Sequence, residues 1–182
     1  MTRVQFLAFN SAWEIDMTDR KRSGLLEAAV LAAIGRANEQ VKLLPKTQLR
    51  IAVWHHALLH VEGMKNVNVV GHLTKAGVKL VLHGDVHEAN VAANPFRWPG
   101  LTILGVGAFG AKAIDRQEST PRMYHVVELM PGDGPSGFGW ARVHTRARPK
   151  AEGPWESGNI WNKPGEGKVA TLDVDLTSGG PR

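Results

Sequence analysis

The chain has no cysteine among its 182 residues. This absence excludes disulfide bonds and thiolate zinc sites, and it fits a protein of a reducing compartment. Long apolar runs are also missing, since no stretch approaches the ~18 residues that a membrane-spanning helix needs. The stretch from Met1 to Val4 lacks the apolar region of a signal peptide. We therefore expect a cytoplasmic protein with no membrane partner.

Charge of one sign is not strongly concentrated in the sequence. Twenty-two lysines and arginines against 17 acidic residues give a net charge of +5, which can attract nucleic acid or anionic substrates. Basic residues cluster only between Arg142 and Lys150, and no nucleic-acid-binding motif accompanies them. Nucleic acid is therefore a partner that the composition permits and that no motif supports.

The first half of the chain alternates between strand and helix patterns. Apolar residues at helical spacing predict a helix from the N-cap candidate Ser23 to about Asn38, and a shorter helix over residues 67–76 that ends at Gly77. This alternation is typical of an α/β layer. The predicted strands of this half cover residues 4–10, 50–55 and 79–83.

The second half is rich in strands and carries no helical periodicity. Glycine, proline and aspartate separate the strands, so we expect an antiparallel meander that forms the second sheet of a sandwich. The glycines at 105, 107 and 110 precede no helix, so they favour close packing or a bulge over dinucleotide binding. The predicted strands of this half cover residues 101–106, 124–129 and 139–145.

The last part of the chain has a different composition. Residues 146–167 combine basic residues with proline, glycine and tryptophan, which predicts an irregular excursion over the surface. We expect Trp155 and Trp161 to attach it to the domain. An alternating pattern predicts an edge strand over residues 169–176, and residues 178–182 form a tail.

Two of the predicted strands end in histidines. The apolar run before His55 and His56 is one, and the run that leads into His83, Asp85 and His87 is the other. Carboxyl ends of strands in one α/β sheet meet at one edge, where ligands bind. Imidazole and carboxylate groups together can hold a divalent metal ion, although a polar loop after a core strand is the alternative. Neighbouring residues of an extended chain point to opposite sides, so we expect only one histidine of the first pair to face such an ion.

These stretches resemble the last two motifs of the calcineurin-like metallophosphoesterases. Members of that family carry a strand that ends in His-His-Pro or His-Ser-Pro and, further along, a Gly-His-x-His loop. His55-His56-Ala57 is similar to the former, and the stretch from His83 to Glu88 is similar to the latter. Three flanking segments are also similar to segments of the family, namely Phe9-Asn10-Ser11-Ala12, residues 101–110 and residues 123–129.

The resemblance covers roughly residues 4–145. It implies an α/β fold, a partial metallophosphoesterase-like β-sandwich flanked by helices, over residues 1–145. Residues 146–182 would then supply the surface excursion, edge strand and tail of the same domain. The implied activity is metal-dependent hydrolysis of a phosphoester substrate, with Mn²⁺, Fe²⁺/Fe³⁺ or Zn²⁺ as cofactors.

The resemblance also implies roles for individual residues. His55 and Asp85 would bind one metal ion, and His87 would bind the other. His56 and His83 would orient ligands or contact phosphate oxygens in catalysis.

The chain departs from the family pattern in three ways. Asp85 stands where the family has the first histidine of Gly-His-x-His, and Ala57 stands in place of the proline. The Asp-x-His, Gly-Asp-x-x-Asp and Gly-Asn-His motifs of the family do not occur before the Asn-Ser strand, so the chain resembles the C-terminal half of such a domain. We therefore expect an incomplete or inactive site unless a missing N-terminal half or a partner chain completes it. The alternative is a non-catalytic remnant that acts as an interaction or structural module.

Overall fold

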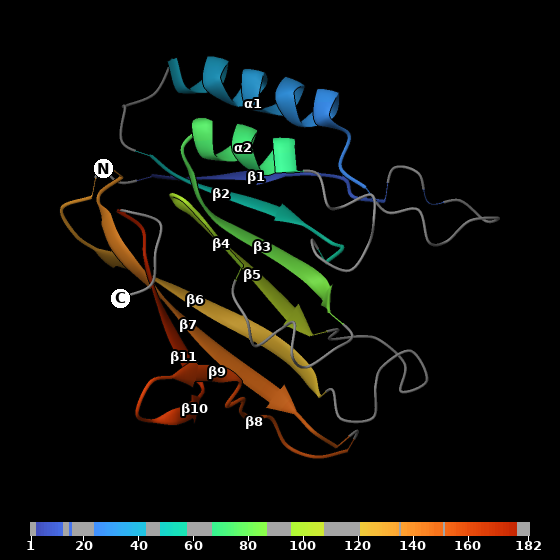
Figure 1. Cartoon of the computed structure of the whole chain (residues 1–182), viewed down its shortest axis with the longest axis vertical. Helices are drawn as coiled ribbons and strands as arrows, with labels where there is room; N and C mark the ends of the chain where they lie inside the picture. The colour runs from blue at the N-terminus through green and yellow to red at the C-terminus, as the bar shows by residue number, and fades with distance from the viewer. Residues whose placement is uncertain are drawn as a thin grey trace.

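The structure is a computed structural model of the chain, and its elements lie in three layers. Helices α1 and α2 lie on one face of a five-stranded sheet, and a second, antiparallel sheet lies on the other side (Figure 1). The coarse α/β class expected from the sequence is therefore confirmed. The structure describes residues 3–12, 15, 24–42, 48–57, 67–86, 96–107, 121–134, 136–150 and 152–177.

The five-stranded sheet is parallel except at one edge. Its order is β1-β2-β3-β5-β4, and only β4 runs antiparallel to its neighbour. The parallel arrangement brings the carboxyl ends of β2 and β3 side by side, where the histidine stretches lie. The strands are β1 (Arg3–Ala8), β2 (Gln48–Trp54), β3 (Val78–Val86), β4 (Phe96–Trp98) and β5 (Leu101–Gly107).

Two helices, α1 (Glu27–Lys42) and α2 (Val67–Lys75), cover one face of this sheet. Each buries the apolar side of its helical repeat, for example Val30 in α1 and Leu73 in α2, which are 1% and 0% exposed. Full burial of one such side chain contributes about 1.5–3 kcal/mol to folding. Gly77 follows α2 with a φ of 76°, which confirms it as the stop of that helix.

The second sheet packs on the other face through its alternating residues. β7 (Phe138–Arg148) lies between β6 (Arg122–Pro131) and β11 (Thr171–Asp175), and all three pair antiparallel. Its inward residues, such as Val143, meet Leu80 and Leu104 of the parallel sheet in a second core that also includes Trp161. This second antiparallel sheet and the edge strand β11 confirm the predictions for residues 124–145 and 169–176. The placement of residues 101–106 in the antiparallel meander is wrong, because these residues form β5, which pairs parallel with β3 in the first sheet.

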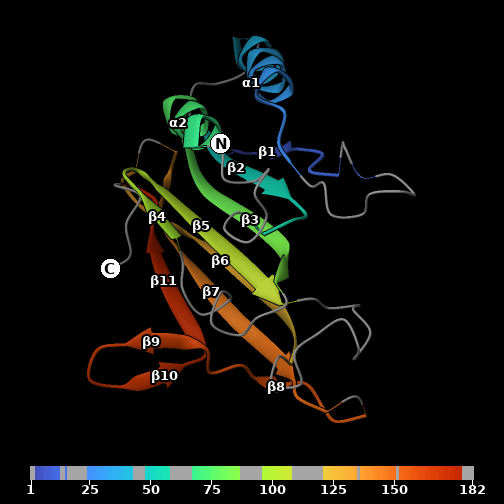
Figure 2. The same cartoon turned by 45° about the vertical axis from the view of Figure 1, so that its right-hand side comes forward.

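The segment after β7 is more regular than expected. The prediction of an irregular excursion is wrong in part, because it contains the short strands β8 (Glu156–Ser157) and β9 (Trp161–Lys163), and β9 pairs with β10 (Gly167–Val169). The β9–β10 hairpin lies at the end of the molecule remote from the helices (Figure 2). Trp161 is 1% exposed, which confirms that it attaches this segment to the core.

The first helix also differs from its prediction at both ends. It begins at Glu27 and ends at Lys42. The N-cap candidate Ser23 lies outside the described residues, and so does the tail predicted over residues 178–182.

No helix within the described ranges is long and apolar enough to cross a membrane.

Candidate metal centre

The candidate site lies where β2 and β3 end. Trp54, the last residue of β2, pairs with His83 of β3, so His55 and His56 follow β2 at the level where Asp85 stands on β3. The expectation that parallel strand ends bring these side chains to one edge is confirmed for His55 and Asp85.

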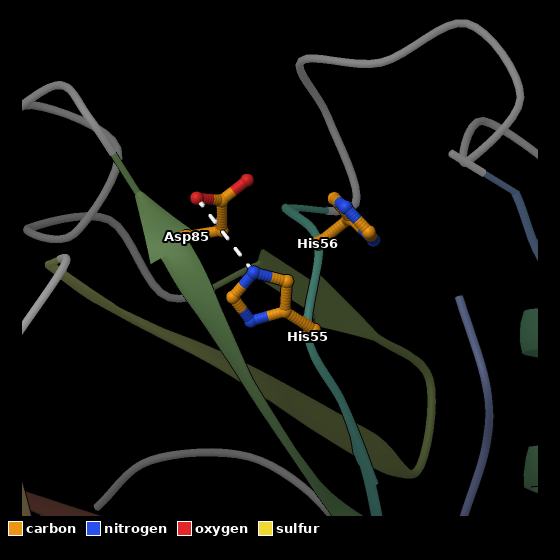
Figure 3. Close-up of side chains that lie close together, drawn as sticks. All are labelled: His55, His56 and Asp85. Atoms are coloured by element: carbon orange, nitrogen blue, oxygen red, sulfur yellow. Dashed lines mark ion pairs between the residues drawn. The ribbon is translucent and has the colours of Figure 1, made fainter. Parts of the chain in front are cut away.

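Three candidate ligands come together at this edge. His55 Nε2 lies 3.9 Å from Asp85 Oδ1, and one ligand atom each of His55, His56 and Asp85 lie within 4.8 Å of one another (Figure 3). Metal–ligand bonds of about 2.1 Å at a tetrahedral angle place ligand atoms about 3.4 Å apart. The three groups would therefore have to approach by roughly 0.5–1.4 Å to share one ion.

The backbone conformation explains why both histidines are near Asp85. β2 ends at Trp54 and the chain bends at His55 and His56, so the alternation of an extended strand does not apply to them. Their ring centroids lie 4.8 Å apart at 71°. The expectation that the two histidines point to opposite sides is therefore wrong.

Asp85 adopts a backbone conformation that is uncommon for a residue with a side chain. Its φ is 55°, and the pairing of β3 with β5 is interrupted between His83 and Val86. Asp and Asn tolerate this left-handed region better than most residues. The turn expected at Gly84 thus lies one residue later, at Asp85, and this places the carboxylate beside His55.

Ser11, at the end of the first strand region, holds the His55–His56 bend in place. Its Oγ accepts the backbone N–H groups of both histidines at 3.2 Å and lies 2.8 Å from His56 Nδ1. The indole N–H of Trp54 donates to the His56 carbonyl at 2.9 Å. Ser11 is 2% exposed and His56 is 8% exposed, so this bend is built into the interior of the site.

Burial sets the protonation of His56. It lowers the pKa of the His56 ring, and the neighbouring His55 lowers it further, whereas Asp85 and the backbone of Ser11 act in the opposite direction. The net result is a pKa below the ordinary value for histidine, so His56 is neutral at neutral pH.

His83 packs against Trp54 and Gly105 and is not one of the three members of the cluster. Its ring stacks on Trp54 with centroids 6.4 Å apart, and its Nδ1 donates to the Gly84 carbonyl at 3.0 Å. A Cβ at Gly105 of β5 would lie 2.6 Å from His83 Cε1, which confirms the close packing expected at that glycine. The packing of His83 therefore helps to hold β3 in place two residues before Asp85.

A network of half-buried and buried side chains ties the second sheet to the same glycine. His125 Nε2 donates to the Gly105 carbonyl at 3.1 Å, and Thr145 Oγ1 lies 3.1 Å from His125 Nδ1. The indole N–H of Trp161 donates to Thr145 Oγ1 at 2.9 Å. Burial lowers the pKa of His125 to about 4, so the ring is a neutral hydrogen-bonding element of the core.

The remaining predictions for histidines have mixed outcomes. His87, the expected ligand of a second metal ion, lies outside the described residues. His72 contacts Glu27 and His144 contacts Glu128, each at 2.7 Å, which agrees with structural or surface roles for both. Ser11 is the residue of this site that sequence reasoning missed, and its contacts to His55 and His56 identify it. Its only signal was the Asn-Ser end of the first strand.

Comparison with known proteins leaves the family open. No family model, curated protein or solved structure matches this chain.

Proposed function

We propose that this chain forms part of a metal-dependent phosphoesterase, with His55 and Asp85 as ligands of one divalent cation. The observation that carries the proposal is the approach of these side chains, 3.9 Å apart, at the carboxyl ends of adjacent parallel strands. They are 30 residues apart in the sequence, and a bent backbone at His55 and a left-handed backbone at Asp85 direct them together. The likeness of both strand ends to metallophosphoesterase motifs supports the same interpretation.

The donor set fits a divalent cation. His55 offers an imidazole nitrogen, and Asp85 offers a carboxylate that adds negative charge and favours hard ions such as Mn²⁺ or Mg²⁺. A bound ion would polarise a phosphoryl oxygen and help to form hydroxide at neutral pH. The side chain of His55 is 67% exposed, so a substrate could reach it from solvent.

Two or three ligands do not make a bridged pair of metal ions. Among the described residues, His55, His56 and Asp85 are the candidate ligands that come together. We propose that the other ligands come from His87 and from a further segment or partner chain. The isolated chain should therefore bind Mn²⁺ or Zn²⁺ no more tightly than micromolar and should hydrolyse an aryl phosphodiester negligibly.

Metal binding by calorimetry tests the site directly. His55→Ala and Asp85→Ala should each weaken Mn²⁺ binding by about tenfold or more, because each removes one of few ligands. Asp85→His should preserve binding, because imidazole also ligates Mn²⁺. The matched control is His144→Ala, which removes a histidine paired with Glu128 away from the site. Unchanged Mn²⁺ binding in both alanine variants would refute the site.

Hydrolysis of bis(p-nitrophenyl) phosphate with added Mn²⁺ tests the reaction. Turnover should appear when the metallophosphoesterase motifs that the chain lacks are supplied in cis or in trans, and His55→Ala should abolish it. Robust metal-dependent turnover by the isolated chain would refute the incomplete site. Inactivity of the completed protein, even with Asp85→His, would favour the non-catalytic interaction or structural module.

A further inference from the structure

The hydrogen bonds around Ser11 determine where the proton of the His56 ring lies. A serine hydroxyl has one hydrogen to donate and two lone pairs that accept. At Ser11, the N–H groups of His55 and His56 occupy both lone pairs at 3.2 Å. The third contact, 2.8 Å to His56 Nδ1, must therefore use the serine hydrogen.

Because the Ser11 hydroxyl donates its hydrogen in this contact, Nδ1 of His56 is the acceptor. A neutral imidazole carries its one proton on the nitrogen that does not accept, so the proton is on Nε2. The Ser11 carbonyl also lies near the ring and raises its pKa, but it accepts the Gly24 N–H at 3.0 Å, and the hydrogen-bond contact of 2.8 Å to the ring is that of the hydroxyl. Nε2 lies on the side of the ring remote from Nδ1 and hence from Ser11.

We infer that Ser11 fixes His56 as the Nε2–H tautomer, so that His56 serves as a hydrogen-bond donor to an oxyanion of the phosphate class and not as a metal ligand. Ser11 is then a positioning residue that acts through His56. The tautomer follows from Ser11 alone, whereas the oxyanion as its target rests on the proposed function.

The three residues of the cluster then fall into two kinds of group. A metal ion needs a lone pair, and His55 and Asp85 can each supply one. His56 cannot, because its Nδ1 lone pair accepts the Ser11 hydroxyl hydrogen and its Nε2 carries a proton. A phosphate oxygen beside the ion needs N–H donors, because oxyanions accept hydrogen bonds. One nitrogen of His56 lies within 4.8 Å of the ligand atoms of His55 and Asp85. The ring is therefore close enough to donate a hydrogen bond to a phosphate oxygen that binds the same ion.

The tautomer can be observed without metal or substrate. Long-range ¹H–¹⁵N correlation spectra of the ¹⁵N-labelled full chain at pH 7.5 distinguish a protonated from an unprotonated ring nitrogen, and His56→Gln identifies the His56 signals. We expect the Nε2–H pattern in the wild type. Ser11→Ala should shift His56 to a mixture of tautomers, and Ser11→Thr, which keeps the hydroxyl, should restore the pattern. An Nδ1–H pattern in the wild type overturns the inference and needs no variant to fold.

Binding measurements test the role of the donor. His56→Ala should leave Mn²⁺ affinity within about threefold, whereas it should weaken inorganic phosphate binding to the Mn²⁺-loaded chain by about tenfold or more, the typical loss for a hydrogen bond to a charged group. His56→Gln can present an N–H donor near the Nε2 position, so it should retain most of the phosphate affinity. A fall in Mn²⁺ affinity as large as that of His55→Ala overturns the inference, and so does phosphate binding that His56→Ala does not change. Absence of any Mn²⁺ binding in the wild type refutes the proposed function, while the spectra still decide the tautomer.

Discussion

Acid should destabilise this protein through His125. Its ring is half-buried between the two sheets, and this burial lowers its pKa from 6.5 to about 4. In the unfolded chain the His125 ring has its ordinary pKa, so below pH 6.5 the unfolded chain binds a proton that the folded chain does not bind. The contribution of His125 is complete above pH 6.5 and is lost progressively as pH falls towards 4.

The size of the loss follows from the two pKa values. The difference of about 2.5 units corresponds to roughly 3 kcal/mol once both states are protonated, at about 1.4 kcal/mol per unit. At pH 5 the unfolded ring is almost fully protonated and the folded ring is not, and linkage gives a loss of about 2 kcal/mol relative to pH 7.5. This is a large fraction of the 5–15 kcal/mol that stabilises a typical domain.

Urea denaturation followed by tryptophan fluorescence measures the effect. The free energy of unfolding should be determined at pH 7.5 and pH 5 for the wild type and for His125→Gln, which cannot titrate. We expect the difference between the two proteins to shrink by about 2 kcal/mol at pH 5. Other titrating groups are common to both proteins and cancel in this comparison. His144→Gln is the comparison variant, because it removes a histidine at the surface against Glu128 and leaves the His125 network intact.

A pH dependence that is the same in wild type and His125→Gln, within about 0.5 kcal/mol, would refute the reasoning. It would mean that the ring is solvated in the folded state, or that the network with Thr145 and Gly105 accepts a charged ring.

Two further predictions concern backbone positions. Gly105→Ala should lower stability by about 1–3 kcal/mol in the same urea assay, because the new Cβ would lie 2.6 Å from His83 Cε1. Gly35→Ala, in open space on α1, should instead raise stability by about 0.4–1 kcal/mol. Equal effects of the two substitutions would contradict the packing described at Gly105. Asp85→Gly should raise stability by up to about 1 kcal/mol, because glycine adopts a φ of 55° without strain, and it should weaken Mn²⁺ binding. A loss of stability would show that the Asp85 side chain contributes more to folding than its backbone conformation costs.

The sequence predicts the strands of this fold well because their signals are local. The runs before His55 and His83 are apolar, and they become β2 and β3, which are buried between the helices and the second sheet. The carboxyl ends of such strands meet at one edge by geometry alone. The meeting of the two strand ends that carry His55 and Asp85 therefore follows from the strand pattern of the sequence.

Backbone conformation at the site could not be predicted in the same way. A glycine beside an aspartate favours the turn at the glycine, yet the positive φ is at Asp85. The reason is tertiary, since the pairing of β3 with β5 shifts between His83 and Val86. The bend at His55 and His56 likewise depends on Ser11, whose Oγ contacts them from 44 and 45 positions earlier in the chain.

The short strands after β7 were missed for a related reason. Two or three residues carry too little periodicity to indicate a strand. β8 forms because Arg146 and Ala147 of β7 offer it a pairing edge, and the guanidinium of Arg146 donates to the Trp155 carbonyl at 2.8 Å. Long-range pairing of this kind leaves no pattern within the segment itself.

The two candidate ligand histidines differ in how they are held, and this decides which of them can respond to a metal ion. His56 is buried and its ring is bonded to Ser11 at 2.8 Å, so moving it towards an ion would break that bond. The side chain of His55 is 67% exposed, and its Nε2 lies 3.9 Å from Asp85 Oδ1, about 0.5 Å more than a tetrahedral site requires. A small rotation of His55 can close that gap without disturbing the core. Capture of an ion should thus order the His55 ring and leave His56 on Ser11, in agreement with one histidine as ligand and the other as donor.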